Sequence, residues 1–147
     1  MTAPHPEGAG ARRALEVALE GAGLPAQAVN YVNAHGSGTR HNDEVEIAVL
    51  RAVLGERLAQ VPVSSTKSQV GHCLAAAGAI EAVATVVALE RGVLPPTVNL
   101  RAVDAAWADL DLVPRAGRRA SLAVAVTSSS GFGGHNVTLV LARPGAL

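Results

Sequence analysis

Helical and strand-like hydrophobic patterns alternate along this sequence. From residue 9 to 21, apolar residues recur every three to four positions, which predicts an amphipathic helix that ends at glycines. Short apolar runs at 29–33 and 61–64 predict two strands. A second amphipathic pattern lies between them and predicts a helix capped by Asn42 or Asp43.

The second half of the chain continues this alternation and closes with a hairpin. An almost wholly apolar pattern predicts a long helix from about Gly71 to Glu90, and a loop-rich segment with weak periodicity follows over 97–119. Apolar runs at 121–129 and 137–141 predict two strands joined by the glycine-rich turn S-G-F-G-G-H-N. The order α-β-α-β-α-β-β indicates an α/β layer fold with a mixed sheet.

Length and composition favour one compact unit over residues 1–147. The chain has 147 residues, of which 49% are hydrophobic but only 2% aromatic, so we expect a core of Ala, Val and Leu. Lys and Arg number 12 and are balanced by 12 Asp and Glu. Without a net field, a basic stripe or stacking aromatics, we expect neither nucleic acid nor a membrane surface as a partner.

The single cysteine and the N-terminus favour a cytoplasmic location. Cys73 has no second cysteine to pair with, and residues 1–8 lack the charged and apolar regions of a secretory signal. The most apolar run, from Cys73 to Leu89, contains Glu81 and is rich in Ala and Gly. This run is therefore predicted to be a core helix and not a membrane span.

Candidate chemistry follows three of the predicted strands. His35 comes after the first strand, Lys67 and His72 after the second, and Phe132 after the third. If the first two strands are parallel neighbours, His35 and His72 converge on one pocket at the sheet edge. Two imidazoles there suit hydrogen-bond donation to a developing oxyanion. The charge of Lys67 would keep both rings neutral.

Each of these residues also has a purely structural interpretation. His35 is equally well explained as a packed core residue, and a metal site at His35, His72 and Asp43 would lack the usual tight ligand spacing. Cys73 could pair with a histidine as a nucleophile, but its apolar neighbours favour a small core-filling residue. Glu81 lies either at a solvated edge or buried against a cation or several hydrogen-bond donors.

Six segments in order carry a family resemblance. They read V-N-A-H-G-S-G-T, N-D-E-V-E, V-S-S-T-K-S-Q-V-G-H, A-A-A-G-A-I-E, L-P-P-T-V-N-L and G-F-G-G-H-N. Together they resemble the C-terminal half of a β-ketoacyl-acyl-carrier-protein synthase of the elongating type, from fatty-acid or type II polyketide synthesis. The resemblance implies a thiolase-like half-domain with three α-β-α layers. It also implies decarboxylative condensation of an acyl thioester with malonyl-carrier protein.

The resemblance assigns catalytic roles to three residues and supporting roles to two more. His35 and His72 match the two histidines that donate to the malonyl thioester oxygen, and Lys67 matches the family's lysine. Glu46 falls where an acidic residue pairs with that lysine. Phe132 matches a gating phenylalanine whose backbone N–H helps to form the oxyanion hole.

The resemblance also implies contacts to a substrate arm and to an ion. Ser37 and Thr39 occupy positions that contact the phosphopantetheine arm of the acyl-carrier protein. Asn33, Glu81 and Ser128 fall near a structural site for Na⁺ or K⁺, and no organic cofactor is implied.

The sequence departs from the family pattern at several places. It reads H-G-S-G-T where elongating synthases often read H-G-T-S-T, and Ser128 and Ser130 replace an asparagine and a phenylalanine. The half that bears the family's nucleophilic cysteine has no counterpart here, and Cys73 does not match its position. The chain is therefore predicted to be inactive alone.

The resemblance implies several partners. These are the N-terminal ketosynthase half, the acyl-carrier protein and a second subunit in a homo- or heterodimer. A non-catalytic partner resembling a chain-length factor, or a stand-alone interaction module with the same fold, is the alternative. The two histidines and the lysine argue against the non-catalytic partner.

Overall fold

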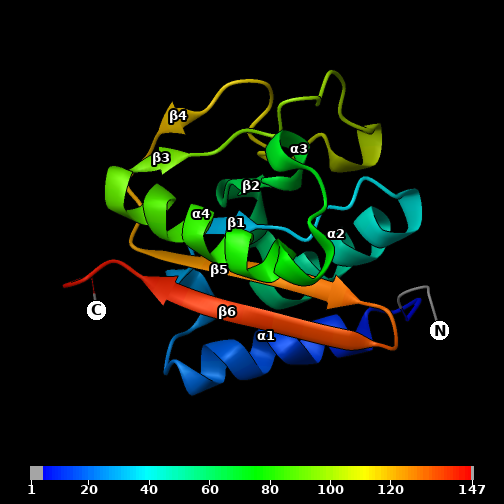
Figure 1. Ribbon diagram of the computed structural model, residues 1–147. Coiled ribbons are helices and arrows are strands. Elements are labelled where there is room, and N and C mark those ends of the chain that lie inside the picture. Colours follow the sequence, from blue (N-terminus) through cyan, green and yellow to red (C-terminus); the bar gives the residue numbers. More distant parts are fainter. Residues whose placement is uncertain (1–4, 147) are drawn as a thin grey trace.

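A four-stranded mixed sheet forms the centre of the computed structural model, which describes residues 5–146 (Figure 1). The strand order is β2-β1-β5-β6. β1 (Tyr31–Asn33) pairs in parallel with β2 (Val63–Ser64) and with β5 (Val124–Gly131), and β5 pairs antiparallel with β6 (His135–Ala142). The predicted hairpin and the predicted parallel pairing of the first two strands are confirmed. Residues 1–4, which belong to the predicted irregular N-terminus, lie outside the described residues.

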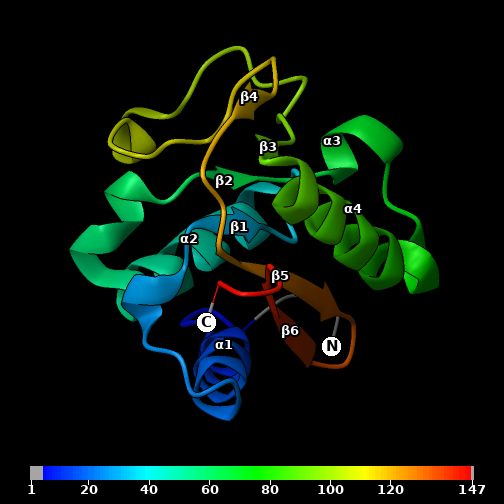
Figure 2. The same cartoon turned by 90° about the vertical axis from the view of Figure 1, so that its left-hand side faces the viewer.

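Helices cover both faces of this sheet, as the three-layer prediction requires (Figure 2). α1 (Ala9–Gly21) and α2 (Arg40–Leu54) lie on one face, and α4 (Ala77–Arg91) lies on the other. Successive residues of a strand point to opposite faces of the sheet, so the strands contribute side chains to two cores, one on each face. The first core contains Leu15, Leu19, Leu50, Val32 and Val126, and the second contains Tyr31, Ala88, Leu89, Ala125 and Leu122.

The predicted long helix is wrong over its first six residues. The chain after β2 instead forms a short helix, α3 (Lys67–Val70), and a 3₁₀ turn at Leu74–Ala76 before α4 begins at Ala77. Gly71 and Leu74 have φ angles of 77° and 51°, which a right-handed helix does not accommodate. His72 therefore lies in an irregular loop and not on a helix.

The structure also corrects the predicted start of α2 and adds detail to the segment 92–123. α2 begins at Arg40 with Thr39 as its N-cap, and not at Asn42 or Asp43. The segment 92–123 contains a two-stranded antiparallel sheet of β3 (Val93–Leu94) and β4 (Arg118–Arg119), and only β4 lies within the predicted loop-rich segment 97–119. Fully buried side chains within 92–123, including Leu94 and Val113, extend the core beneath α4.

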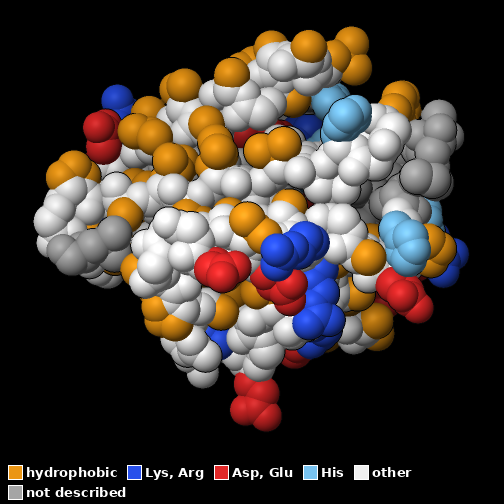
Figure 3. Space-filling model, turned by 90° about the horizontal axis from the view of Figure 1, so that it is seen from below, with side chains coloured by type: hydrophobic (Ala, Val, Ile, Leu, Met, Phe, Trp, Pro, Cys, Tyr) orange, Lys and Arg blue, Asp and Glu red, His pale blue; other side chains and the backbone are white. Residues whose placement is uncertain are grey.

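Several large apolar side chains remain exposed on α4 and β6. This open surface consists of Ile80, Val83, Val86, Val87, Val137 and Leu139. In Figure 3, hydrophobic side chains gather along the upper part of the view, whereas many of the charged side chains lie lower. None of the described helices is long and apolar enough to cross a membrane. The open surface lies on a helix of 15 residues and on an edge strand of the sheet.

Candidate active site

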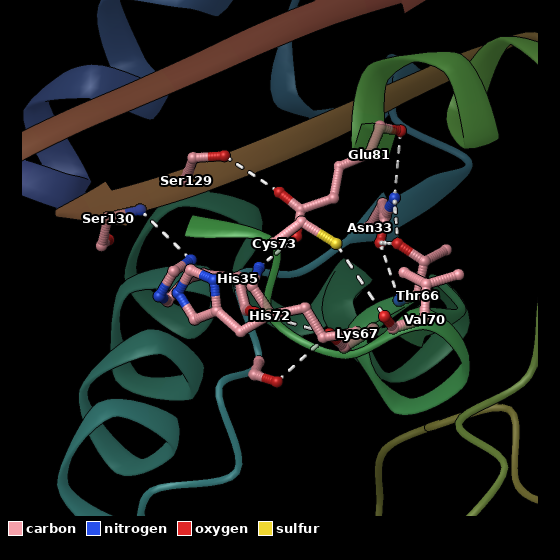
Figure 4. Close-up of polar contacts among 12 residues, drawn as sticks. Asn33, His35, Thr66, Lys67, Val70, His72, Cys73, Glu81, Ser129 and Ser130 are labelled. Carbon is pink, nitrogen blue, oxygen red and sulfur yellow. Dashed lines mark hydrogen bonds and ion pairs between the residues drawn. The ribbon is translucent and has the colours of Figure 1, made fainter. Parts of the chain in front are cut away.

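Polar side chains that belong to β5 or follow β1 and β2 meet at one edge of the sheet (Figure 4). β1, β2 and β5 run parallel, so their carboxyl ends lie at the same edge. His35 follows β1, Lys67 and His72 follow β2, and Ser129 and Ser130 lie in the last residues of β5. The predicted convergence of His35 and His72 is confirmed, because their ring centroids lie 5.5 Å apart with the planes at 82°.

His35 is buried and held in one tautomer. Only 7% of the residue is exposed, and its Nδ1 accepts the backbone N–H of Ser130 at 3.3 Å. A neutral ring whose Nδ1 accepts carries its proton on Nε2. Desolvation by burial, followed by the charges of Lys67 and His72, lowers the pKa of His35 to about 4. The ring is therefore a neutral Nε2–H donor near pH 7.

His72 has the same internal arrangement but is exposed to solvent. Its Nδ1 accepts the backbone N–H of Leu74 at 3.1 Å, which again places the proton of the neutral ring on Nε2. Both imidazoles line one hollow of about 390 Å³. The site thus offers two N–H donors to a group placed in this hollow.

Small residues make room for the hollow between α4 and the β5–β6 hairpin. Ala77, Gly78 and Ala82 line it from α4, and Val137 and Leu139 line it from β6. A Cβ on Gly78 would lie 3.3 Å from Ser129 Oγ, so glycine permits the close approach of α4 to β5. The hollow is partly open to solvent.

Glu46 supports His35 in a way that differs from the prediction. Its Oε1 accepts the N–H of His35 at 2.7 Å, and its Oε2 accepts the N–H of Gly36 at 2.8 Å. Both oxygens accept, as in an ionised carboxylate. Burial raises the pKa of Glu46, and the two N–H donors oppose this shift. The predicted ion pair between Glu46 and Lys67 is not formed, because Glu46 is occupied by the backbone that carries His35.

Lys67 pairs instead with Glu81. The two side chains are 6% and 2% exposed, and Nζ of Lys67 contacts Oε1 of Glu81. Ser129 donates its hydroxyl to the other carboxylate oxygen at 3.0 Å. Glu81 is therefore buried and partnered, which excludes the solvated-edge interpretation. The pair places a fixed cation near enough to His35 to lower the pKa of that ring.

The side chains predicted to hold a monovalent cation do not assemble as a set. Asn33 is fully buried, but its Oδ1 already accepts from the N–H and the hydroxyl of Thr66. Ser128 shares a face of β5 with Val126, away from α4, and its hydroxyl contacts Thr138 at 3.1 Å. Glu81 approaches β5 from the opposite face, through Ser129. The predicted donors therefore do not fit a cation.

An unpartnered oxygen does lie on the correct face of β5. Thr127 points to the same side as Ser129, lines the hollow and is 4% exposed. Among the described residues, its hydroxyl is the buried side-chain group without a hydrogen-bond partner. Thr127, and not Ser128, is the β5 residue with a free buried oxygen beside the site.

The remaining predicted residues do not line the hollow. Phe132 is 76% exposed at the tip of the hairpin. The hydroxyls of Ser37 and Thr39 lie 3.1 Å apart in the loop before α2. Cys73 is partly exposed in the loop beside His72 and belongs to neither core, so its prediction as a core-filling residue is wrong.

Comparison with known proteins identifies the family of the chain. Residues 1–101 match the model of the β-ketoacyl synthase C-terminal domain. The chain belongs to the β-ketoacyl synthase family. It is 47% identical over 143 residues to a 3-oxoacyl-[acyl-carrier-protein] synthase 2 of Synechocystis, covering 97% of this chain and 34% of the relative. It is 46% identical to an actinorhodin polyketide putative β-ketoacyl synthase 1 of Streptomyces coelicolor, covering 96% of this chain and 30% of that protein.

Solved ketosynthases show the same fold. The ishigamide ketosynthase/chain length factor superposes with a TM-score of 0.90 at 36% identity, covering 98% of this chain and 34% of that one. A type II polyketide ketosynthase in complex with its acyl-carrier protein also gives a TM-score of 0.90, at 39% identity, covering 97% of this chain and 35% of that one. The chain therefore spans about a third of the length of these relatives and has the fold of the C-terminal part of a thiolase-type synthase.

The sequence did not reveal three parts of the site. The backbone N–H groups of Ser130 and Leu74 and the hydroxyl of Ser129 hold the two histidines and Glu81. Ser129 and Ser130 belong to a motif that the sequence did mark. Nothing in the sequence marks Leu74, because its role depends on the direction of a backbone N–H.

Proposed function

We propose that this chain supplies the decarboxylation site of a β-ketoacyl-acyl-carrier-protein synthase of fatty-acid or polyketide synthesis. The observation that carries the proposal is the pair of imidazoles at the hollow, each with Nδ1 occupied by a backbone N–H, so that the neutral form of each ring carries its proton on Nε2. Family membership agrees with this chemistry.

The proposed step places the carbonyl oxygen of a malonyl thioester against the two Nε2–H donors. Cleavage of the bond to the carboxylate releases carbon dioxide, and its electron pair forms an enolate whose oxygen becomes negative. His35 and His72 stabilise this oxygen, and removal of one such donor costs roughly 2.7–4 kcal/mol of barrier. Lys67, paired with Glu81, favours a neutral His35 ring and adds positive charge near the developing anion.

The enolate carbon then attacks the carbonyl carbon of an acyl thioester on a nucleophile that this chain does not supply, which forms the new carbon–carbon bond, breaks the thioester and releases that nucleophile as a thiolate. In our proposal a cysteine from the N-terminal ketosynthase half carries the acyl group, and Cys73 has no part in the chemistry. The hollow and the open surface are where that half would pack, because apolar areas of this kind mark interfaces. Ser37 and Thr39 would contact the phosphopantetheine arm, and Phe132 would gate the entrance to the cysteine.

Two relatives bear on the wider assembly. One is named as a ketosynthase with its chain length factor, and another is a ketosynthase bound to an acyl-carrier protein. We extend both kinds of partner to the complete form of this enzyme, as a homo- or heterodimer that binds an acyl-carrier protein.

A chimeric synthase tests the proposal. Residues of this chain replace the matching third of the Synechocystis synthase, which is 47% identical to it. Release of carbon dioxide from malonyl-acyl-carrier protein is measured for the chimera and for its His35→Ala and His72→Ala variants. His41→Ala is the control, because His41 is exposed on α2.

We expect each active-site variant to lose decarboxylation by roughly a hundredfold or more, while the control retains it. A folded chimera whose decarboxylation survives both substitutions would refute the assignment. It would instead support a non-catalytic partner subunit or an interaction module.

A further inference from the structure

Leu74 has an unusual backbone for a leucine. Its φ angle is 51°, in the left-handed region, and its side chain is 79% exposed at the rim of the hollow. Its backbone N–H is the donor to Nδ1 of His72 at 3.1 Å. One residue therefore combines a strained backbone, an exposed apolar side chain and a direct contact to a site histidine.

The strain at Leu74 needs a compensating interaction. A left-handed conformation costs an L-residue roughly 1–2 kcal/mol, whereas glycine adopts it freely and asparagine tolerates it. The chain uses glycine for this purpose three residues earlier, at Gly71 with φ 77°. Strain that persists at a non-glycine residue is found at functional sites that it pre-organises.

The hydrogen bond to His72 supplies that compensation. His72 is exposed, and its ring has one recorded hydrogen bond among the described residues, the one from Leu74. Among the described residues, no other hydrogen bond to the His72 ring would favour its Nε2–H form over its Nδ1–H form if this N–H were absent. His35 differs, because burial and the strand β5 fix its ring.

We infer that Leu74 is a positioning residue for His72: its left-handed backbone aims an N–H at Nδ1 and thereby keeps the proton on Nε2, facing the hollow. The catalytic role of that proton rests on the proposed function, but the tautomer of His72 can be measured without any turnover. The side chain has a separate role, since an exposed leucine at the rim suits packing against the half that closes the hollow.

Two substitutions separate the backbone from the side chain. Leu74→Asn removes the apolar group but tolerates the left-handed conformation, whereas Leu74→Val keeps an apolar group that is β-branched and disfavours that conformation. A backbone role therefore predicts that asparagine preserves the geometry of His72 and that valine disturbs it. A role through apolar packing predicts the reverse.

The test is ¹⁵N NMR of histidine-labelled 147-residue chain at a pH where His72 is neutral. In the wild-type chain and in Leu74→Asn we expect His72 as the Nε2–H tautomer, and in Leu74→Val a mixture of both tautomers. In the chimera, Leu74→Val should lower kcat for decarboxylation by roughly ten- to a hundredfold with little change in KM, as for a misdirected oxyanion donor.

A Leu74→Val chain that retains a single Nε2–H tautomer would overturn the inference, and so would a folded Leu74→Asn chain that loses it. Circular dichroism confirms that both variants are folded before the comparison. If the tautomers behave as expected but the chimera shows no dependence on His72, the proposed function fails and the positioning role stands.

Discussion

Replacement of Glu46 by glutamine removes one of two hydrogen bonds that hold the His35 loop. Glu46 accepts from the N–H of His35 and the N–H of Gly36 with its two carboxylate oxygens. Glutamine has the same shape but one oxygen and one NH₂ group. In Glu46→Gln the side-chain NH₂ group therefore faces one of these two backbone N–H groups, so that two donors meet without an acceptor.

The expected loss follows from these contacts. A hydrogen bond to a charged group contributes about 1.5–3 kcal/mol, and the Glu46 contacts are short, at 2.7 and 2.8 Å. We expect Glu46→Gln to lower the free energy of unfolding by about 2 kcal/mol. For a chain of this size that corresponds to a decrease in Tm of roughly 4–8 °C.

Thermal and urea denaturation followed by circular dichroism measure this loss. Glu44→Gln is the matched control, because Glu44 lies on the same helix and pairs with Arg40 on the exposed surface at 2.8 Å. We expect the control to cost no more than about 0.5 kcal/mol. Equal losses in the two variants, or a Glu46→Gln chain as stable as wild type, would refute the proposed anchoring of His35.

Three further predictions concern the same site. Because burial lowers the pKa of His35 to about 4, the unfolded chain binds more protons between that value and the ordinary pKa near 6.5. The free energy of unfolding should therefore fall as pH drops through this window, by an amount on the order of 3 kcal/mol, and His35→Gln should remove that dependence in denaturation series; an unchanged slope would contradict a buried neutral ring. Glu81→Gln leaves the buried Lys67 cation without its carboxylate and should destabilise the chain by about 3–5 kcal/mol, whereas Glu81→Leu combined with Lys67→Met should recover most of the loss in urea titrations. Phe132→Ala should change stability by less than about 0.5 kcal/mol, because the side chain is 76% exposed, so that a lower condensation rate in the chimera would report on the gate and not on folding.

The position of the site could be predicted from the sequence, because strand ends determine it. His35 and His72 each follow a short apolar run, and parallel pairing of those runs is enough to bring the rings together. The alternation of helical and strand-like patterns was equally sufficient to predict the layers and the β5–β6 hairpin. These features depend on hydrophobic periodicity, which follows from the residue types alone.

The contacts between polar groups could not be predicted, since they depend on orientation. Ser128 and Ser129 are alike in the sequence, but the alternation of the strand sends only Ser129 towards Glu81. Lys67 could pair with either of two glutamates, and the choice depends on where α4 begins. An apolar run across Gly71 to Glu90 did not reveal that start, because the sign of φ at Leu74 is not encoded in hydrophobicity.

The pairing of β1 with β5 joins segments that are far apart in chain order. His35 receives the N–H of Ser130 from 95 residues downstream, so the chain leaves the ribosome with this histidine long before its orienting strand. Contacts of such separation carry a large loop-closure entropy and form late. Until β5 docks beside β1, the ring has neither its fixed tautomer nor its position in the hollow. The docking of β5 beside β1 therefore also fixes the ring of His35.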